Sequence, residues 1–167
     1  YFKNIDNIKE SFNKYISHLP QDGYLIVNND DNNSSDLKNH TSASVVTYGI
    51  ENDAMYMAKD ITYDKDGCGS FDVIFEGKKL GRIDLSVPGE HNILNALAAI
   101  SLSYSYGISF NDIKNGIKKY KGASRRLEYK GKFNGADVYD DYGHHPTEIE
   151  ATSNAIHKKE YNESWVI

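Results

Sequence analysis

Apolar residues recur along the chain at two different spacings, and each spacing predicts a different kind of element. Near the start they recur every three or four residues, which is typical of an amphipathic helix; the positions are Phe2, Ile5, Ile8, Phe12, Ile16 and Leu19. Pro20 predicts the end of this helix. Two short apolar runs, 24–27 and 44–50, then predict buried strands, with the polar segment 34–38 as the connecting helix of a βαβ unit.

Between residues 55 and 87 apolar and polar residues alternate, which is the pattern of strands with one buried face. Turn residues interrupt the alternation at Asp66-Gly67 and at Gly77-Lys78. We therefore expect three antiparallel strands that extend the βαβ unit. The whole pattern predicts an α/β fold.

The segment after these strands carries the first candidate binding residues. Pro88 and Gly89 end the last strand, and the apolar positions 93, 97, 100 and 104 form one stripe of a helix. Asn92 and Asn95 lie three residues apart, so both amides fall on one face of its first turn. A carboxamide offers a donor beside an acceptor, which can recognise the edge of an adenine. The alternative is that Asn92 caps the helix and Asn95 covers surface.

A pair of arginines marks a second candidate site. A short helix is expected over 110–120, and the segment after it contains Arg125 and Arg126. The chain has sixteen lysines and three arginines, so two adjacent arginines stand out from the ordinary surface charge. The planar guanidinium group suits forked recognition of phosphate or carboxylate. A basic linker without a binding role is the alternative.

The third cluster runs from Asp140 to Glu148 and combines carboxylates, a phenol and two imidazoles. A hairpin across Asn134-Gly135 is expected before it, and Pro146 sets the first turn of a helix to about residue 158. The polar groups then lie at the carboxyl end of a strand, where open α/β sheets bind ligands. A metal-dependent hydrolase is the competing interpretation, but two adjacent histidines lack the i, i+4 spacing that chelates well.

Composition narrows the possible partners. The net charge is −5, which argues against a nucleic-acid partner held by phosphate contacts. No apolar run approaches the length of a membrane span, no signal peptide is evident, and the lone Cys68 has no internal partner, so we expect a cytoplasmic protein. The chain opens on Tyr1 and closes on the apolar run 165–167, which predicts the start of another strand. We therefore expect part of a longer protein.

Three motifs stand in a fixed order: Gly89-Glu90-His91-Asn92-Ile93-Leu94-Asn95, Ser124-Arg125-Arg126-Leu127-Glu128, and Asp140-Asp141-Tyr142-Gly143-His144-His145-Pro146-Thr147-Glu148. Together they resemble the Mur ligases of bacterial peptidoglycan synthesis, and the last is most similar to the branch that joins L-alanine to UDP-N-acetylmuramate. The strand-end residues 28–31 also resemble the family, so the resemblance covers nearly the whole chain. It implies that residues 1–121 are the latter part of the central ATP-binding domain and that 122–167 begin a Rossmann-like C-terminal domain.

The resemblance also implies roles for single residues. Asn92 and Asn95 match the asparagines that contact adenine, Arg126 the arginine near the phosphates, and Asp141 the acid at the ribose and the domain junction. The remaining matches are His91 and Tyr142 as nucleotide-binding residues and His144 as a catalytic residue beside Arg126 and Asp141; Tyr142 and His144 could also face the amino acid or the acyl group. The implied reaction is ATP-dependent amide formation through an acyl phosphate, with ATP and Mg²⁺, in cell-wall biogenesis, cell shape and cell division.

One family feature is missing from the sequence. No Gly-x-x-x-x-Gly-Lys-Ser/Thr loop occurs in the 167 residues, so the phosphate cradle and its lysine are expected outside them. The resemblance implies that the magnesium ligands and the UDP-sugar domain also lie outside them. We therefore expect the chain by itself to have no ligase activity. Another Mur-type ligase, or a noncatalytic nucleotide-binding module, is the alternative.

Overall fold

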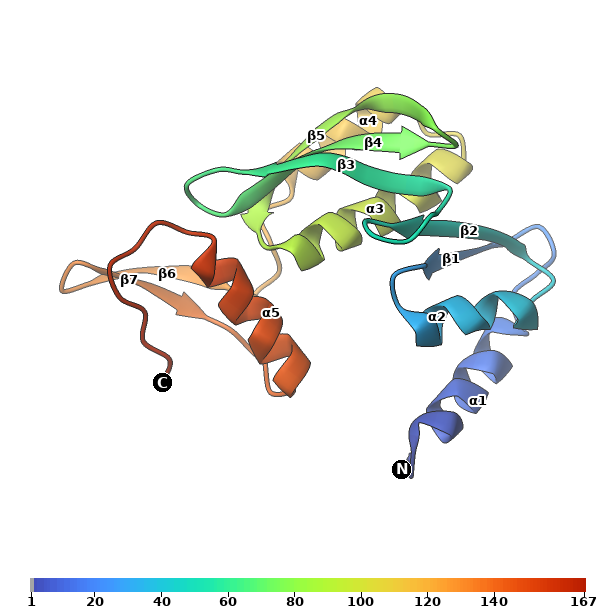
Figure 1. The fold of residues 1–167 in the computed structure, drawn as a ribbon, viewed down its shortest axis with the longest axis horizontal. Helices are drawn as coiled ribbons and strands as arrows, with labels where there is room; N and C mark the ends of the chain where they lie inside the picture. Colours follow the sequence, from blue (N-terminus) through green and yellow to red (C-terminus); the bar gives the residue numbers. More distant parts are fainter. Residues whose placement is uncertain (1) are drawn as a thin grey trace.

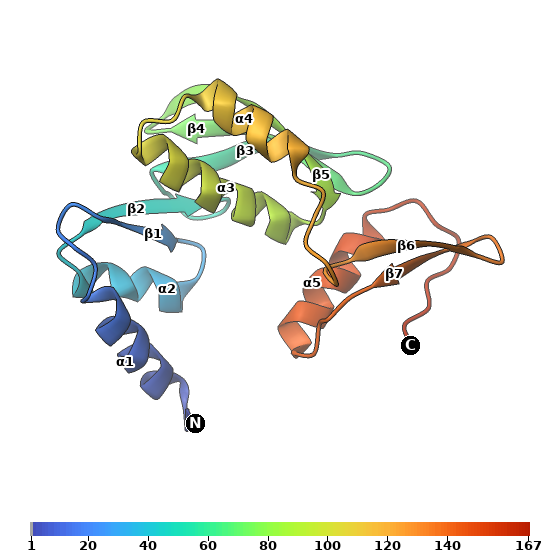
Figure 2. The ribbon, with the colours of Figure 1, turned by 180° about the vertical axis from the view of Figure 1, so that it is seen from behind.

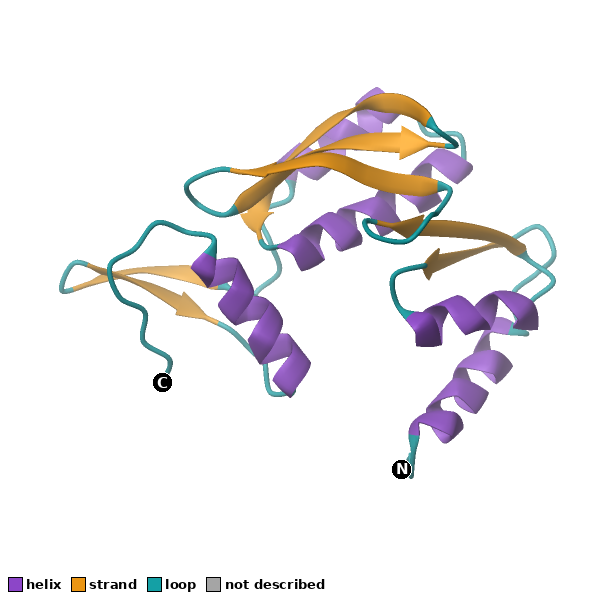
Figure 3. Ribbon diagram, in the orientation of Figure 1, coloured by secondary structure: helices purple, strands orange, loops and turns teal. Residues whose placement is uncertain are grey.

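The computed structural model describes residues 2–167, which form two separate sheets with helices around them (Figure 1, Figure 3). The helices are α1 (Ile5–Ile16), α2 (Asn32–Asp36), the 3₁₀ helix η1 (Leu37–His40), α3 (Glu90–Ser105), α4 (Phe110–Lys119) and α5 (Pro146–His157). The strands are β1 (Tyr24–Asn28), β2 (Ser44–Gly49), β3 (Tyr56–Tyr63), β4 (Cys68–Phe75), β5 (Lys78–Pro88), β6 (Glu128–Phe133) and β7 (Ala136–Asp140).

The larger sheet has the order β1-β2-β3-β4-β5 and is mixed. β1, β2 and β3 run parallel to one another, whereas β4 is antiparallel to both β3 and β5. The expected βαβ unit and the expected antiparallel extension are therefore both present. They form one continuous sheet because β3 pairs with a strand of each kind.

Helices α3 and α4 cover one face of this sheet, as Figure 2 shows from behind. The expected apolar stripe of α3 is fully buried at Ile93, Leu97 and Ile100. It packs in one cluster with Phe71 and Ile83 of the sheet, which are also fully buried. Burying a side chain of this size contributes roughly 1.5–3 kcal/mol, so the α3 stripe anchors the first turn of α3 rigidly on the sheet.

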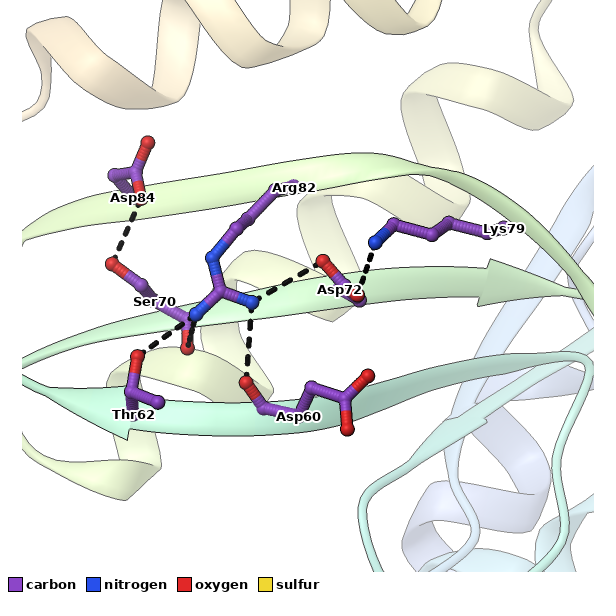
Figure 4. Close-up of polar contacts among 7 residues, drawn as sticks. All are labelled: Asp60, Thr62, Ser70, Asp72, Lys79, Arg82 and Asp84. Carbon is purple, nitrogen blue, oxygen red and sulfur yellow. Dashed lines mark hydrogen bonds and ion pairs between the residues drawn. The ribbon is translucent and has the colours of Figure 1, made fainter.

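The opposite face of β3, β4 and β5 carries a polar network (Figure 4). Asp72, only 4% exposed, accepts from Lys79 and, at 3.2 Å, from Arg82. These two cations hold the pKa of the Asp72 carboxyl below its usual value, with the Lys79 hydrogen bond as the largest cause. Arg82 also donates to Thr62 Oγ1 at 2.8 Å and to the carbonyl of Asp60 at 3.2 Å, inside an irregular stretch of β3. Arg82 therefore ties three strands together.

Polar residues after β1 join the ends of the parallel strands. The Asp30 carboxylate accepts from the backbone N–H groups of Ile50, Glu51 and Asn52 at 2.7, 3.1 and 2.7 Å. Asp31 caps α2 by accepting from the N–H of Asn33 at 2.7 Å. The side chains of the predicted turn after β1 are therefore hydrogen-bonded within the chain, and Asp30 fixes the loop after β2.

The smaller sheet is the hairpin β6-β7, followed directly by α5. Its turn residues Asn134 and Gly135 both have positive φ, as a tight hairpin turn requires. Pro146 lies at the start of α5 as predicted, and His145 caps the helix by accepting from the N–H of Thr147 at 3.3 Å. The hairpin shares no strand with the larger sheet.

One expectation about the chain ends is wrong, and another is confirmed with narrower bounds. Residues 165–167 are not a strand: Trp165 and Val166 are 83% and 84% exposed, and within residues 2–167 no strand pairs with them to supply the hydrogen bonds a strand needs. The first helix is confirmed but shorter than its apolar pattern, since Phe2 and Leu19 lie outside α1. Within residues 2–167, no helix combines the length and the apolar character required to span a bilayer.

Candidate functional site

A cleft of about 1150 Å³ lies between the first turn of α3 on one side and the hairpin with α5 on the other. Its lining includes five of the seven residues singled out in the sequence, namely His91, Asn92, Asn95, Arg126 and Asp141. The connecting segment 120–128 forms a further part of the wall. Groups more than 30 residues apart in the chain thus share one cavity.

The two asparagines form a short hydrogen-bonded chain. Asn92 Nδ2 donates to the carbonyl of Pro88 at 2.7 Å, and Asn95 Nδ2 donates to Asn92 Oδ1 at 3.2 Å. Gly89 occupies the N-cap position of α3, so the capping alternative for Asn92 is wrong. Asn95 is exposed and lines the cleft. A carboxamide has two donor hydrogens and an acceptor, so Asn95 can bind a ligand while Asn92 orients it.

Asp141 ties the loop after β7 to the segment before β6. Its Oδ2 accepts from the N–H of Leu127 at 2.8 Å, and its Oδ1 accepts from the N–H of Gly143 at 2.7 Å. Arg125 and Leu127 have φ values of 57° and 46°, in the left-handed region that side chains other than glycine disfavour. Asp141 therefore stabilises a strained segment that forms one wall of the cleft.

Arg126 and His91 face the cleft from opposite sides. Arg126 lies 3.6 Å from Glu148 Oε1, and its side chain is 53% exposed. His91 is half-buried, and burial is the main cause that lowers the pKa of its imidazole; Asp141 opposes this shift, and Arg126 adds to it. The pKa of His91 is thus below its usual value, so the imidazole is neutral at neutral pH and can accept a hydrogen bond or stack.

Tyr142 and His144 are not brought into the cleft. The Cζ atom of Arg125 lies 4.5 Å from the ring centroid of Tyr142, so the guanidinium packs over this ring. The ring centroids of Tyr142 and His144 are 5.3 Å apart. His144 Nδ1 is 3.1 Å from the carbonyl of Tyr142. The two residues form an exposed cluster beside the cleft. Within residues 2–167, no group of three or more His, Cys, Asp and Glu side chains is placed to hold a metal ion.

Other residues of the cleft were not singled out in the sequence. Glu128 and Glu148 line it and belong to the quoted motifs, so the motifs carried a signal for them. Lys121 and Lys159 also line it, but they lie outside every motif. Their position depends on how the two sheets meet, which no local pattern encodes.

Glu128 allows a direct test of the wall of the cleft. Its carboxylate pairs with Lys130 at 2.8 Å and accepts from the N–H of Arg125 at 2.8 Å and from Ser124 at 3.1 Å. These contacts, led by Lys130, lower its pKa from 4.5 to about 2. The folded-state pKa is depressed, so the contribution of Glu128 to stability is present above pH 4.5 and is lost as the pH falls towards 2.

We expect an NMR titration of Glu128 to give a pKa near 2, and the Lys130→Met variant to raise it towards the ordinary value. Lys132→Met is the matched control, because Lys132 pairs with Asp137 at 3.4 Å instead. An ordinary pKa for Glu128 in the unaltered chain would mean that segment 124–128 is not held as described.

Comparison with known proteins decides the family. Residues 1–103 match the family model of the Mur ligase middle domain, and residues 125–167 match that of the Mur ligase glutamate ligase domain. The chain belongs to the Mur ligase family. The resemblance drawn from the three motifs is thereby confirmed.

Two curated relatives of this Mur ligase chain carry the same name. It is 48% identical over 155 residues to UDP-N-acetylmuramate--L-alanine ligase of Caldanaerobacter subterraneus subsp. tengcongensis, covering 93% of the chain and 34% of the relative. It is 42% identical over all 167 residues to the ligase of that name from Clostridium beijerinckii, covering 36% of that relative. The chain thus spans about a third of the length of these relatives.

Solved structures of Mur ligases share the fold. MurF from Acinetobacter baumannii superimposes with a TM-score of 0.84 at 23% identity, over 95% of this chain and 34% of that one. UDP-N-acetylmuramate-alanine ligase MurC from Thermotoga maritima gives a TM-score of 0.77 at 24% identity, over 93% of this chain and 34% of that one. The predicted α/β fold of a Mur ligase with an antiparallel extension is confirmed. The structure adds that the parallel and antiparallel strands share one mixed sheet, and that a second, small antiparallel sheet lies beside it.

Proposed function

We propose that this chain is part of an ATP-dependent ligase that joins L-alanine to UDP-N-acetylmuramate in the cytoplasm, as a step of peptidoglycan synthesis. The observation that carries the proposal is the cleft, which unites the first turn of α3 with Arg126 and Asp141. The names of the curated relatives support the choice of substrates. We further propose that residues 1–121 belong to the central domain and residues 122–167 to the C-terminal domain.

The cleft suits a nucleotide in size and in chemistry. Its volume of about 1150 Å³ is slightly above the range of about 300–1,000 Å³ that is usual for small-molecule sites, so a nucleotide fits with room to spare. Asn95 would bind the adenine edge, oriented by Asn92, and the neutral imidazole of His91 would lie beside it. Arg126 would approach the phosphates, because its guanidinium is exposed in the cleft and already near a carboxylate that phosphate oxygens can replace.

The reaction that we propose is the one that the resemblance to the Mur ligases implies. The muramyl carboxylate would attack the γ-phosphate of ATP, breaking its bond to the β,γ-bridging oxygen and releasing ADP, to give an acyl phosphate. The amine of L-alanine would then attack the acyl carbon, lose a proton and displace inorganic phosphate to form the amide. Mg²⁺, when bound, would neutralise charge on the transferred phosphoryl group. Positioning by two units that meet across the cleft would supply much of the rate. His144 and Tyr142 would contribute from beside the cleft. The 167 residues alone lack a phosphate-binding loop, so we expect no ligation from them.

Asn95→Ala in the full-length ligase tests the adenine site. Alanine is the better helix former, so the fold should be kept while one hydrogen-bonding group is lost. Such a contact is worth on the order of 1 kcal/mol or slightly more, so we expect the KM for ATP to rise roughly tenfold and the KM for L-alanine to change much less. Steady-state kinetics at varied ATP measure this.

Asn115→Ala is the matched control. Asn115 is an exposed asparagine on α4 and does not line the cleft. The same chemical change there should leave both KM values unaltered. If Asn95→Ala lowers the melting temperature while the affinity for ATP stays the same, Asn95 is a structural residue and the adenine assignment is wrong.

A further inference from the structure

A three-residue contact joins α5 to the larger sheet. Lys158, directly after α5, has its Nζ 3.9 Å from the ring centroid of Tyr63 and 3.4 Å from Glu90 Oε2. The Tyr63 hydroxyl donates to the same oxygen of Glu90 at 3.3 Å. Tyr63 is the last residue of β3, and Glu90 is the first of α3. We call Tyr63, Glu90 and Lys158 the Lys158 cluster.

Small residues let the backbones approach closely beside this cluster. Ala155 of α5 is 1% exposed and packs against two glycines of the sheet side. A Cβ at Gly89 would lie 2.9 Å from the Ala155 Cβ, and a Cβ at Gly67 would lie 3.2 Å from the Ala155 carbonyl oxygen. The N–H of Glu160 also donates to the carbonyl of Lys65 at 3.3 Å. The end of α5 is therefore seated on the β3-β4 turn and on the start of α3.

The charge of Lys158 is maintained in this position. Burial tends to lower the pKa of its ammonium group, but the contacts with Tyr63 and Glu90 outweigh burial and raise the pKa above its usual value. The side chain is 31% exposed, so the contact is partly desolvated and is stronger than one in open water.

We propose that Lys158 is a positioning residue that holds α5 against the start of α3 and so sets the width of the cleft. Ala151, Thr152 and Lys159 line the cleft and belong to α5 or follow it, so a displacement of α5 moves one wall away from Asn92 and Asn95. The consequence for nucleotide binding rests on the proposed function. The claim that Lys158 holds α5 in place does not depend on it.

Cys68 is a built-in reporter of the cleft width. It is the single cysteine of the chain, lines the cleft and is half-buried beside Gly67, which α5 covers. We expect iodoacetamide to alkylate Cys68 about fivefold faster in the Lys158→Met and Tyr63→Leu variants of the 167-residue chain, because loss of the contact shifts the population towards open forms. Mass spectrometry follows the reaction.

Controls separate the contact from charge and from folding. Lys158→Arg keeps the cation over the ring and should react at the unaltered rate, as should Lys119→Met, which removes an exposed lysine of α4. Melting curves identify variants that are unfolded. If one of them fails to fold, Glu90→Gln is measured in its place, because it weakens the same cluster, and it should also speed the alkylation of Cys68. Wild-type alkylation rates in folded Lys158→Met and Tyr63→Leu chains would overturn the proposal.

Binding of ATP to the full-length ligase gives the second measurement. If the cleft holds the nucleotide, Lys158→Met should weaken the equilibrium affinity for ATP about fivefold, and Lys158→Arg should restore it. Faster alkylation of Cys68 with unchanged ATP affinity would support the positioning role of Lys158 and refute the nucleotide role of the cleft. The two proposals therefore fail in different ways.

Discussion

In the full-length ligase that we propose, replacing Asp141 by alanine is expected to lower kcat by about 100-fold. The Asp141 carboxylate holds the N–H groups of Leu127 and Gly143, and through them the strained wall that carries Arg126. Without it the segment relaxes towards ordinary φ values, and a shift of about 1 Å in a positioning residue can cost about 100-fold in rate. Rapid-quench or steady-state measurement of ADP release checks this.

Two further substitutions calibrate the Asp141 result. Asp141→Asn keeps one acceptor oxygen and should therefore lose less activity than Asp141→Ala. Asp140→Ala is the neighbouring control; its carboxylate lies 3.7 Å from Arg125 and does not line the cleft, so kcat should change by less than about threefold. Equal effects at positions 140 and 141 would contradict the role assigned to the two hydrogen bonds.

Asp30→Ala is expected to destabilise the fold by about 3 kcal/mol. One carboxylate accepts three backbone N–H groups of the loop after β2, and alanine leaves all three without that acceptor. For a chain of this length the melting temperature should fall by about 6–12 °C, measured by circular dichroism or calorimetry.

Asp36→Ala provides the comparison for Asp30. Asp36 forms an exposed ion pair with Lys9 at 3.0 Å, and its side chain is 70% exposed, so its loss should cost less than about 1 kcal/mol. If Asp30→Ala melts like Asp36→Ala, water replaces the carboxylate in the loop after β2, and the hydrogen bonds of Asp30 contribute little.

Elements with strong local signals were predictable from the sequence. The apolar stripe of α3 is buried as expected, because apolar residues at helical spacing form one face of a helix and that face packs on the core. Asn134-Gly135 and Pro146 act through their own backbone preferences, so the hairpin turn and the start of α5 follow without knowledge of the rest of the fold.

Features that depend on how the two sheets meet were not predictable. Asp141 was chosen from a motif, but its hydrogen bonds to the backbone of Leu127 need the tertiary fold. Lys158 was predicted only as the end of a helix. The residues next to it in the sequence do not indicate a contact with Tyr63, which lies 95 positions earlier. The expected strand at 165–167 was wrong because apolar character gives a tendency to pair and does not supply the partner.

The edge strand β5 carries two features that hinder the addition of a strand from another molecule. β5 lies at the end of the strand order, so its outer edge could accept a strand from another molecule. Lys78 and Lys79 place charge at the start of that edge, and its pairing with β4 is irregular between Val73 and Ile74. Charge and irregular register both hinder the addition of a foreign strand. We infer that Arg82 and its partners keep the face of this hairpin that no helix covers polar, so that this face does not offer an apolar surface to another molecule (Figure 4).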